Sequence, residues 1–135
     1  MVIEIQGKYE GDLRVQLIHG PSQSTIETDA PKDNQGKGEK FSPTDLLVSA
    51  LGACMVTIMG IVANRDGINF EGVHFRAEKH MKENPRRIGK IVLEIYMPKG
   101  LTDEQKKKLE KFAHTCPVHQ SIHPEMEQDI KFIYG

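Results

Sequence analysis

The sequence predicts an α+β fold in which antiparallel sheets pack on one long buried helix. Three features of the 135-residue chain predict it: an uncharged central stretch, alternation of apolar and polar residues on both sides of that stretch, and an amphipathic segment near the C-terminus. Alternation with a period of two is typical of strands, and a helix that is apolar all round has to be buried. A chain of this length is expected to form a single domain, residues 1–135.

The first part of the chain, residues 1–30, is expected to form strands, because apolar and polar residues alternate there between turn-forming residues. Gly11-Asp12 reads as a turn between the first two strands. The expected strands are Val2–Ile5, Leu13–Leu17 and Ser24–Thr28. Residues 31–41 are rich in polar and turn-forming residues and are expected to form a loop.

The central helix is expected over residues 43–64. Ser42 can cap the helix, Pro43 suits the first helical position, and Asp45 can complete a capping box. From Leu46 to Ala63 no residue is charged. The start of the helix is therefore specified locally, and its body has to be shielded from water.

The uncharged stretch is at the lower length limit for a membrane span. We expect a buried core helix instead, because the stretch contains Gly52 and Gly60 and is closed by the polar run 64–66. A chain of this size rarely encloses such a helix alone. We therefore expect a sheet on one side and a second copy of the protein on the other, which makes a homodimer with Cys54 near the interface.

The second half of the chain repeats the strand pattern and adds a helix. A hairpin is expected over 70–97, with a turn around Asn84-Pro85. A helix follows over 103–115, capped by Thr102 with Gln105 in the box position. Pro117 is expected to close this helix next to Cys116, and residues 129–134 are expected to form the final strand.

Composition excludes several classes of function. The net charge is −1 with the two signs intermixed, so no basic patch indicates nucleic-acid binding, and the absence of Trp removes a platform for stacking bases. The first residues lack the basic head and apolar stretch of a signal peptide. We expect a cytoplasmic protein. In a reducing compartment, two cysteines are more often thiols that are used for chemistry or left idle than a permanent disulfide.

The two cysteines suit a pair of redox-active thiols. Cys54 lies in the middle of the central helix, beyond the reach of the helix dipole, so it is inert by default unless a cation is delivered from elsewhere. Cys116 lies at a helix end, where the chain can change direction. An attacking thiol that forms a sulfenic acid and a second thiol that resolves it into a disulfide would fit these positions.

A metal site is the competing interpretation. His114, Cys116, His119 and His123 offer ligands that zinc accepts, and Cys54 could be a further one. Pro117 and Pro124 constrain the local geometry, and the spacing matches no common zinc pattern. We expect no metal and no cofactor, and interpret these histidines as solvated or capping residues.

Two motifs carry a family resemblance. The run SPTDLL at 42–47 with LGAC at 51–54, followed by CPV at 116–118, resembles the OsmC/Ohr family of osmotically inducible and organic hydroperoxide resistance proteins. The likeness includes the N-terminal run GDLR at 11–14 and the order of elements. The resemblance implies an intertwined homodimer that reduces organic hydroperoxides, with hydrogen peroxide as a further candidate substrate. The expected reductant is an external dithiol or a lipoyl-type compound.

The resemblance also implies residue roles. Cys54 would be the peroxidatic cysteine, Cys116 the resolving cysteine, and Arg14 the cation that favours the Cys54 thiolate. In the peroxidase branches a glutamate usually follows the proline and pairs with the arginine, whereas this chain has Thr44 there and its acid, Asp45, one residue later. The pattern is closer to the broader OsmC-like group, and Asp45 is the candidate replacement for the missing acid.

The substrate pocket is expected to be apolar and to include Leu47, Leu51 and Pro117, which would favour alkyl peroxides. The alternative function is a non-catalytic dimer that binds an apolar small molecule at the subunit interface.

Overall fold

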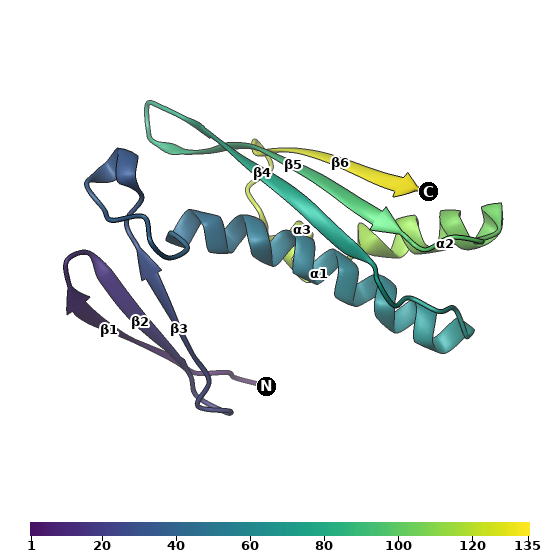
Figure 1. Cartoon of the computed structure of the whole chain (residues 1–135), viewed down its shortest axis with the longest axis horizontal. Coiled ribbons are helices and arrows are strands. Elements are labelled where there is room, and N and C mark those ends of the chain that lie inside the picture. Colours follow the sequence, from purple (N-terminus) through teal and green to yellow (C-terminus); the bar gives the residue numbers. More distant parts are fainter. The chain divides into compact units, whose positions relative to one another are not determined.

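Two three-stranded sheets and one long helix form the framework of the chain (Figure 1). The computed structural model describes all 135 residues. It divides them into two units, Met1–Leu46 and Leu47–Gly135, which are described separately. The predicted α+β class is confirmed.

The first unit contains an antiparallel sheet in the order β1-β2-β3. Its strands are β1 (Ile5–Gly11), β2 (Arg14–His19) and β3 (Thr25–Asp29), followed by a short 3-10 turn, η1 (Lys32–Asn34). The strand predicted at Val2–Ile5 is wrong: β1 begins only at Ile5. The reason is the hairpin turn, because Asp12 and Leu13 have φ angles of 54° and 64° and pair Gly11 with Arg14, which sets residues 5–11 against β2.

The sheet of the first unit is amphipathic but encloses no hydrophobic core. Its apolar face carries Tyr9, Val15, Leu17 and Ile26, which the strand register brings together. Tyr9 is 62% exposed and Ile26 51%. The buried residues of Met1–Leu46 are all polar: Thr28, Asp29 and Ser42. A three-stranded sheet needs a packed face to be stable, so this face requires a covering surface.

The long helix α1 (Pro43–Asp66) has the local signals that the sequence predicts, and it extends two residues further than expected. The Ser42 backbone N–H donates to Asp45 Oδ2 at 2.9 Å, and the Asp45 N–H donates to Ser42 Oγ at 3.1 Å. At the other end Gly67 has a φ of 69°, and the Ile68 N–H donates to the carbonyl of Ala63 at 2.8 Å. Both ends thus satisfy backbone groups that a helix leaves open.

The second unit packs a sheet against α1 (Figure 1). Its strands are β4 (His74–Lys82), β5 (Arg87–Met97) and β6 (Glu127–Tyr134), in that order across the sheet. The prediction of purely antiparallel sheets is wrong here, because β6 runs parallel to β5. The two helices between these strands form the crossover that a parallel pair requires.

The crossover helices are α2 (Asp103–Ala113) and α3 (Pro117–Ser121). The predicted capping box of α2 is present: Gln105 N–H donates to Thr102 Oγ1 at 3.1 Å, and Thr102 N–H donates to Gln105 Oε1 at 2.9 Å. The helix ends at Ala113 instead of residue 115. Pro117 does not close α2 but occupies the first turn of α3, a position where its missing N–H costs nothing.

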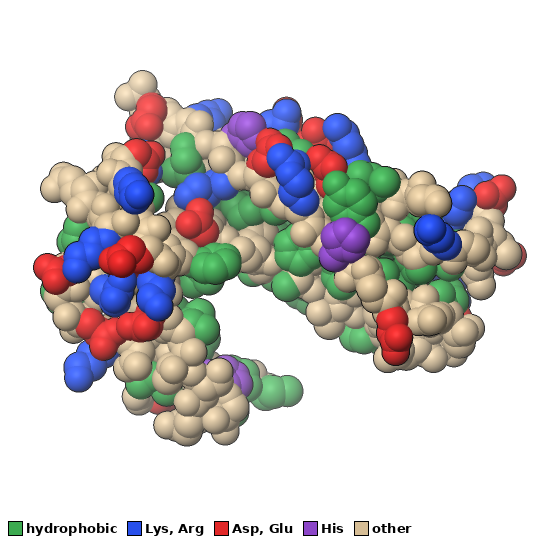
Figure 2. All heavy atoms as spheres, viewed as in Figure 1, with side chains coloured by type: hydrophobic (Ala, Val, Ile, Leu, Met, Phe, Trp, Pro, Cys, Tyr) green, Lys and Arg blue, Asp and Glu red, His purple; other side chains and the backbone are tan.

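The core of the second unit lies between α1 and the inner face of the sheet. Leu51, Met55 and Met59 of α1 are fully buried. They belong to one cluster with alternate residues of β5 and with α2: Ile91, Leu93, Ile95 and Leu109. Charged side chains stay outside, and Figure 2 shows basic and acidic groups interspersed on the visible face.

Helix α1 is buried on one side only. By length and composition it could cross a membrane, and 39% of its most apolar 18-residue window is buried. The exposed positions recur every three or four residues and form one stripe: Leu47, Ala50, Ala53, Thr57 and Ile61. This exposed stripe of α1 is almost entirely apolar, so its shielding has to come from elsewhere.

The two glycines of α1 test how tightly the helix packs. A Cβ at Gly52 would clash with the ring of Phe75, with Cδ2 and Cζ only 2.7 Å away, whereas at Gly60 the nearest atom is 3.7 Å away. We expect Gly52→Ala to lower the free energy of unfolding by about 1–3 kcal/mol through overpacking. Gly60→Ala is the matched control and should be neutral or stabilising by up to about 1 kcal/mol, because Ala has the higher helix propensity. Urea unfolding measures both, and equal effects would contradict the close contact.

Candidate functional site

Two thiols from distant parts of the sequence meet in the second unit. Cys54 lies on α1 and Cys116 directly before α3. Both are free, and the Cys54 thiol lies close enough to act on the pKa of the Cys116 thiol. The pair predicted from the sequence is therefore brought into contact, and a disulfide could form without bringing distant segments together.

Cys116 is the buried partner and caps a helix. It is fully inaccessible, and its Sγ accepts the backbone N–H of His119 at 3.2 Å. Burial raises the pKa of the Cys116 thiol, and the hydrogen bond with Cys54 raises it further, against the opposing effect of the His119 and Val118 amides. Cys116 thus favours the protonated form at neutral pH.

Cys54 is the more accessible partner. It is half-buried and sits at the edge of the exposed stripe of α1, next to Ala53. A reagent that enters from the exposed side can reach Cys54 more easily than Cys116, which is fully buried. This order of accessibility suits a pair in which Cys54 reacts first.

An apolar groove lies beside Cys116. It has a volume of about 390 Å³, and its lining is Leu47, Pro117, Val118, Ser121, Ile122, His123 and Met126. Two of the three predicted pocket residues, Leu47 and Pro117, are in this lining. Leu51 is not, because it is fully buried in the core.

Arg14 lies in the first unit, where it is held by an acid that the sequence analysis did not single out. Its Nε donates to Asp29 Oδ1 at 2.7 Å and its Nη2 to Asp29 Oδ2 at 2.9 Å. The only signal in the sequence was an aspartate directly after the expected strand Ser24–Thr28. The pairing itself depends on the register of β2 and β3, which places Arg14 opposite Asp29.

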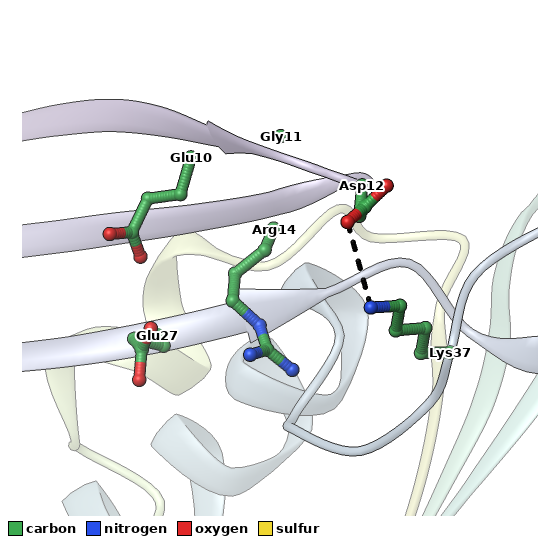
Figure 3. A pocket seen from close by; sticks show the side chains of 6 residues that line it. All are labelled: Glu10, Gly11, Asp12, Arg14, Glu27 and Lys37. Carbon is green, nitrogen blue, oxygen red and sulfur yellow. Dashed lines mark ion pairs between the residues drawn. The ribbon is translucent and has the colours of Figure 1, made fainter.

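Arg14 also lines a polar pocket of about 230 Å³. Figure 3 shows Arg14, Glu10 and Glu27 on three neighbouring strands around this pocket, with Asp12 paired to Lys37 at its rim. A hydrogen bond with Glu27 is the main cause that raises the pKa of Glu10. Glu10 and Glu27 thus interact with each other beside the Arg14 guanidinium.

Asp45 is engaged in the capping box of α1. Its carboxylate accepts the Ser42 N–H, as the capping prediction requires. Arg14 forms its ion pairs with Asp29 and Glu39. The replacement of the missing glutamate by Asp45 therefore stays a prediction, and Asp29 is the acid that pairs with Arg14.

The histidines of the alternative metal site have other partners. Nδ1–H of His114 donates to the carbonyl of Glu110 at 2.8 Å, and Nδ1–H of His119 donates to Gln128 Oε1 at 2.6 Å. Nδ1 of His123 accepts the Glu125 N–H at 3.1 Å. No group of three or more His, Cys, Asp or Glu side chains in the chain is arranged to hold a metal ion.

A neighbouring pair of free thiols in an α+β chain provides the groups that reversible disulfide chemistry requires. Comparison with known families assigns it more closely: the family model described as OsmC-like protein matches residues 36–131. The chain belongs to the OsmC-like protein family, which confirms the resemblance inferred from the two cysteine motifs.

Several known proteins are similar to this chain over most of its length. A crystal structure of a Psychrobacter arcticus protein assigned to the osmotic stress and detoxification response is 43% identical, covers 96% of this chain and 94% of its own, and has a TM-score of 0.92. An organic hydroperoxide resistance protein OsmC from Legionella pneumophila is 19% identical, with 100% and 97% covered and a TM-score of 0.74. An uncharacterised protein of Acinetobacter baylyi is 24% identical over 80% of this chain and 77% of its own length.

The burial of Cys116 generates a pH prediction. In Cys54→Ala, Cys116 is the sole thiol, and its raised pKa should keep alkylation by iodoacetamide slow until the pH exceeds about 8.5, the ordinary value for cysteine. Mass spectrometry of samples quenched at fixed times, repeated across a range of pH, gives the pH midpoint of the alkylation rate. The same variant unfolded in urea is the control and should titrate normally. A folded-state midpoint at or below the ordinary value would contradict this assignment.

Proposed function

We propose that the protein is a thiol-dependent peroxidase that reduces organic hydroperoxides, with hydrogen peroxide as a further candidate substrate. The proximity of the free thiols of Cys54 and Cys116 is the observation that carries this proposal. Its membership of a family whose similar structures include organic hydroperoxide resistance proteins supports a peroxide-related redox role.

The first half-reaction oxidises Cys54. Its thiolate attacks the terminal oxygen of the hydroperoxide, so that an S–O bond forms and the O–O bond breaks. The alkoxide leaves, takes up a proton and becomes the alcohol, and Cys54 becomes a sulfenic acid. Arg14 is proposed as the cation that favours the thiolate and binds the peroxide, in the same chain or across a dimer.

The second half-reaction involves Cys116. The Cys116 thiol gives up its proton and attacks Cys54 Sγ, so that a disulfide forms and the S–O bond breaks. The leaving hydroxide takes up a proton and departs as water. An external dithiol, such as a lipoyl-type reductant, then reduces the disulfide by thiol exchange and is itself oxidised. The burial of Cys116 fits this order, because Cys116 does not need to react with peroxide itself.

The groove beside Cys116 supports an alkyl substrate. Its lining is mainly aliphatic, and a hydrocarbon chain would gain from leaving water there. The cycle needs a reducing supply of dithiols, so we propose a cytoplasmic location.

A homodimer is the assembly that we propose. Two apolar surfaces of the chain are exposed: the stripe on α1 and the face of the first sheet with Tyr9 and Ile26. Small residues in the stripe, Ala50 and Ala53, would let a second helix approach closely. A second copy could cover both surfaces.

The same groove favours a second candidate function. A non-catalytic dimer could retain an apolar small molecule there, with both cysteines incidental. It differs from the peroxidase in one observable way, because its ligand binding would survive replacement of both cysteines by alanine.

The peroxidase is tested by consumption of cumene hydroperoxide with a dithiol present. Wild type should turn over, and Cys54→Ser should lose activity to the uncatalysed level, because it removes the attacking sulfur. Cys116→Ser should consume about one equivalent of peroxide with a Cys54 sulfenic acid detectable by dimedone, and dithiol recycling should be blocked. Turnover by Cys54→Ser at the wild-type rate would refute the assignment.

The dimer is tested by sedimentation velocity at micromolar concentration. Wild type should sediment as a dimer. Ile61→Glu should weaken association at least about a hundredfold, because it would bury an unpaired carboxylate in the exposed stripe of α1. Glu104→Lys on α2 is the control and should stay dimeric. A monomeric wild type, or an unaffected Ile61→Glu dimer, would exclude this interface.

A further inference from the structure

Asp29 is the one charged side chain that the chain buries. It is 1% exposed, and the other buried polar residues, Thr28 and Ser42, are neutral. Burying a charge is unfavourable unless the charge is paired and hydrogen-bonded. Stability alone therefore does not explain why a unit with no hydrophobic core buries this carboxylate.

The Asp29 carboxylate is fully used. Oδ1 accepts Arg14 Nε at 2.7 Å, and Oδ2 accepts Arg14 Nη2 at 2.9 Å. Oδ2 also accepts the backbone N–H groups of Glu39 and Lys40, each at 3.1 Å. The Asp29 backbone N–H donates to the carbonyl of Phe41 at 3.1 Å. The residue thus joins β2, the end of β3 and the segment 39–41.

This arrangement restricts Arg14 in a specific way. A guanidinium has five N–H groups in a rigid plane, and a bidentate carboxylate fixes that plane. Asp29 occupies the edge formed by Nε and Nη2, and Glu39 Oε1 is a looser ion-pair partner 3.6 Å from Nη2. The two N–H groups of Nη1 take no part in these bonds. Arg14 is 28% exposed, so it is neither fully buried nor freely mobile.

We propose that Asp29 is the positioning residue for Arg14: it fixes the Nε–Nη2 edge and leaves the Nη1 edge oriented to bind a thiolate or a peroxide oxygen. This inference rests on the proposed peroxidase function. It assigns to Asp29 a task for which the sequence suggested Asp45.

The charge state of the pair supports this role. The hydrogen bonds from Arg14 are the main cause that lowers the pKa of Asp29 to about 2. Its stabilising effect is therefore complete above about pH 4, the ordinary value of the carboxyl group, and is lost as the pH falls toward 2. The other acids near Arg14 are Glu10, Glu27 and Glu39, and none of them forms the bidentate contact. Asp29 holds Arg14 throughout the neutral range.

The kinetic test compares Asp29→Asn with a matched control. Asp29→Asn keeps the size of the side chain but removes the charge and one acceptor, and we expect kcat/KM for cumene hydroperoxide to fall about ten- to a hundredfold. Asp12→Asn makes the same chemical change at the rim of the same pocket, where Asp12 is 80% exposed, and should not change the rate. Equal rates for wild type and Asp29→Asn would overturn the proposal.

A double-mutant cycle separates positioning from a general structural effect. If Asp29 acts through Arg14, Asp29→Asn should cost little further activity in the Arg14→Lys background, because the bidentate partner is already gone. The full loss in that background would overturn the proposal, since Asp29 would then act independently of Arg14.

A measurement without turnover keeps this inference distinct from the peroxidase itself. The Nε–H proton of Arg14, followed by ¹⁵N NMR, should exchange slowly in wild type, and faster in Asp29→Asn than in Asp12→Asn. This result would support the positioning of Arg14 by Asp29 even if wild type shows no Cys54-dependent turnover. The lack of turnover would refute only the proposed function. If Asp29→Asn does not fold, the wild-type protein alone decides. Exchange of the Arg14 Nε–H proton as fast as in an unstructured arginine peptide would overturn the positioning role of Asp29.

Discussion

The burial of α1 is the constraint on which the rest of the structure depends. Because the helix carries no charge from Leu46 to Ala63, it cannot remain in water. The sheet β4–β6 covers one side of it through Leu51, Met55 and Met59. The opposite side stays apolar and open, and Cys54 lies at the boundary between the two. The exposure of Cys54 follows from this division, since a residue at that boundary can be reached by a reagent and can also lie close to a thiol inside the unit.

Much of the fold could be predicted because single residues specify it locally. The caps at Ser42 and Thr102 each depend on a few neighbouring residues, and both are present. The parallel pairing of β6 with β5 could not be predicted in this way, because it joins segments separated by two helices. Pro117 was ambiguous for another reason: the same residue suits the position after one helix and the first turn of the next. Sequence alone does not say which helix continues.

The candidate site divides along the same line. The two cysteines could be predicted as a pair from their chemistry and their motifs, and the structure brings them into contact. The partner of Arg14 could not, because Asp29 becomes its neighbour only through the register of two strands. Local reasoning found an acid near the helix start, Asp45, which the capping box uses. The acid that pairs with the arginine lies on a neighbouring strand, where burial makes its charge depend on that pairing.

The crossover between β5 and β6 has a thermodynamic consequence for the redox state of the chain. Cys116 lies inside this crossover, and Cys54 lies on the helix that precedes the whole sheet. A bond between them would close a ring from residue 54 to residue 116, containing two of the three strands of the second unit and all of α2. Such a ring removes freedom from the unfolded chain by roughly 4 kcal/mol in the chain-entropy description. Oxidised and reduced molecules would thus differ in resistance to heat and to proteolysis. The oxidised form would therefore persist longer than the reduced form.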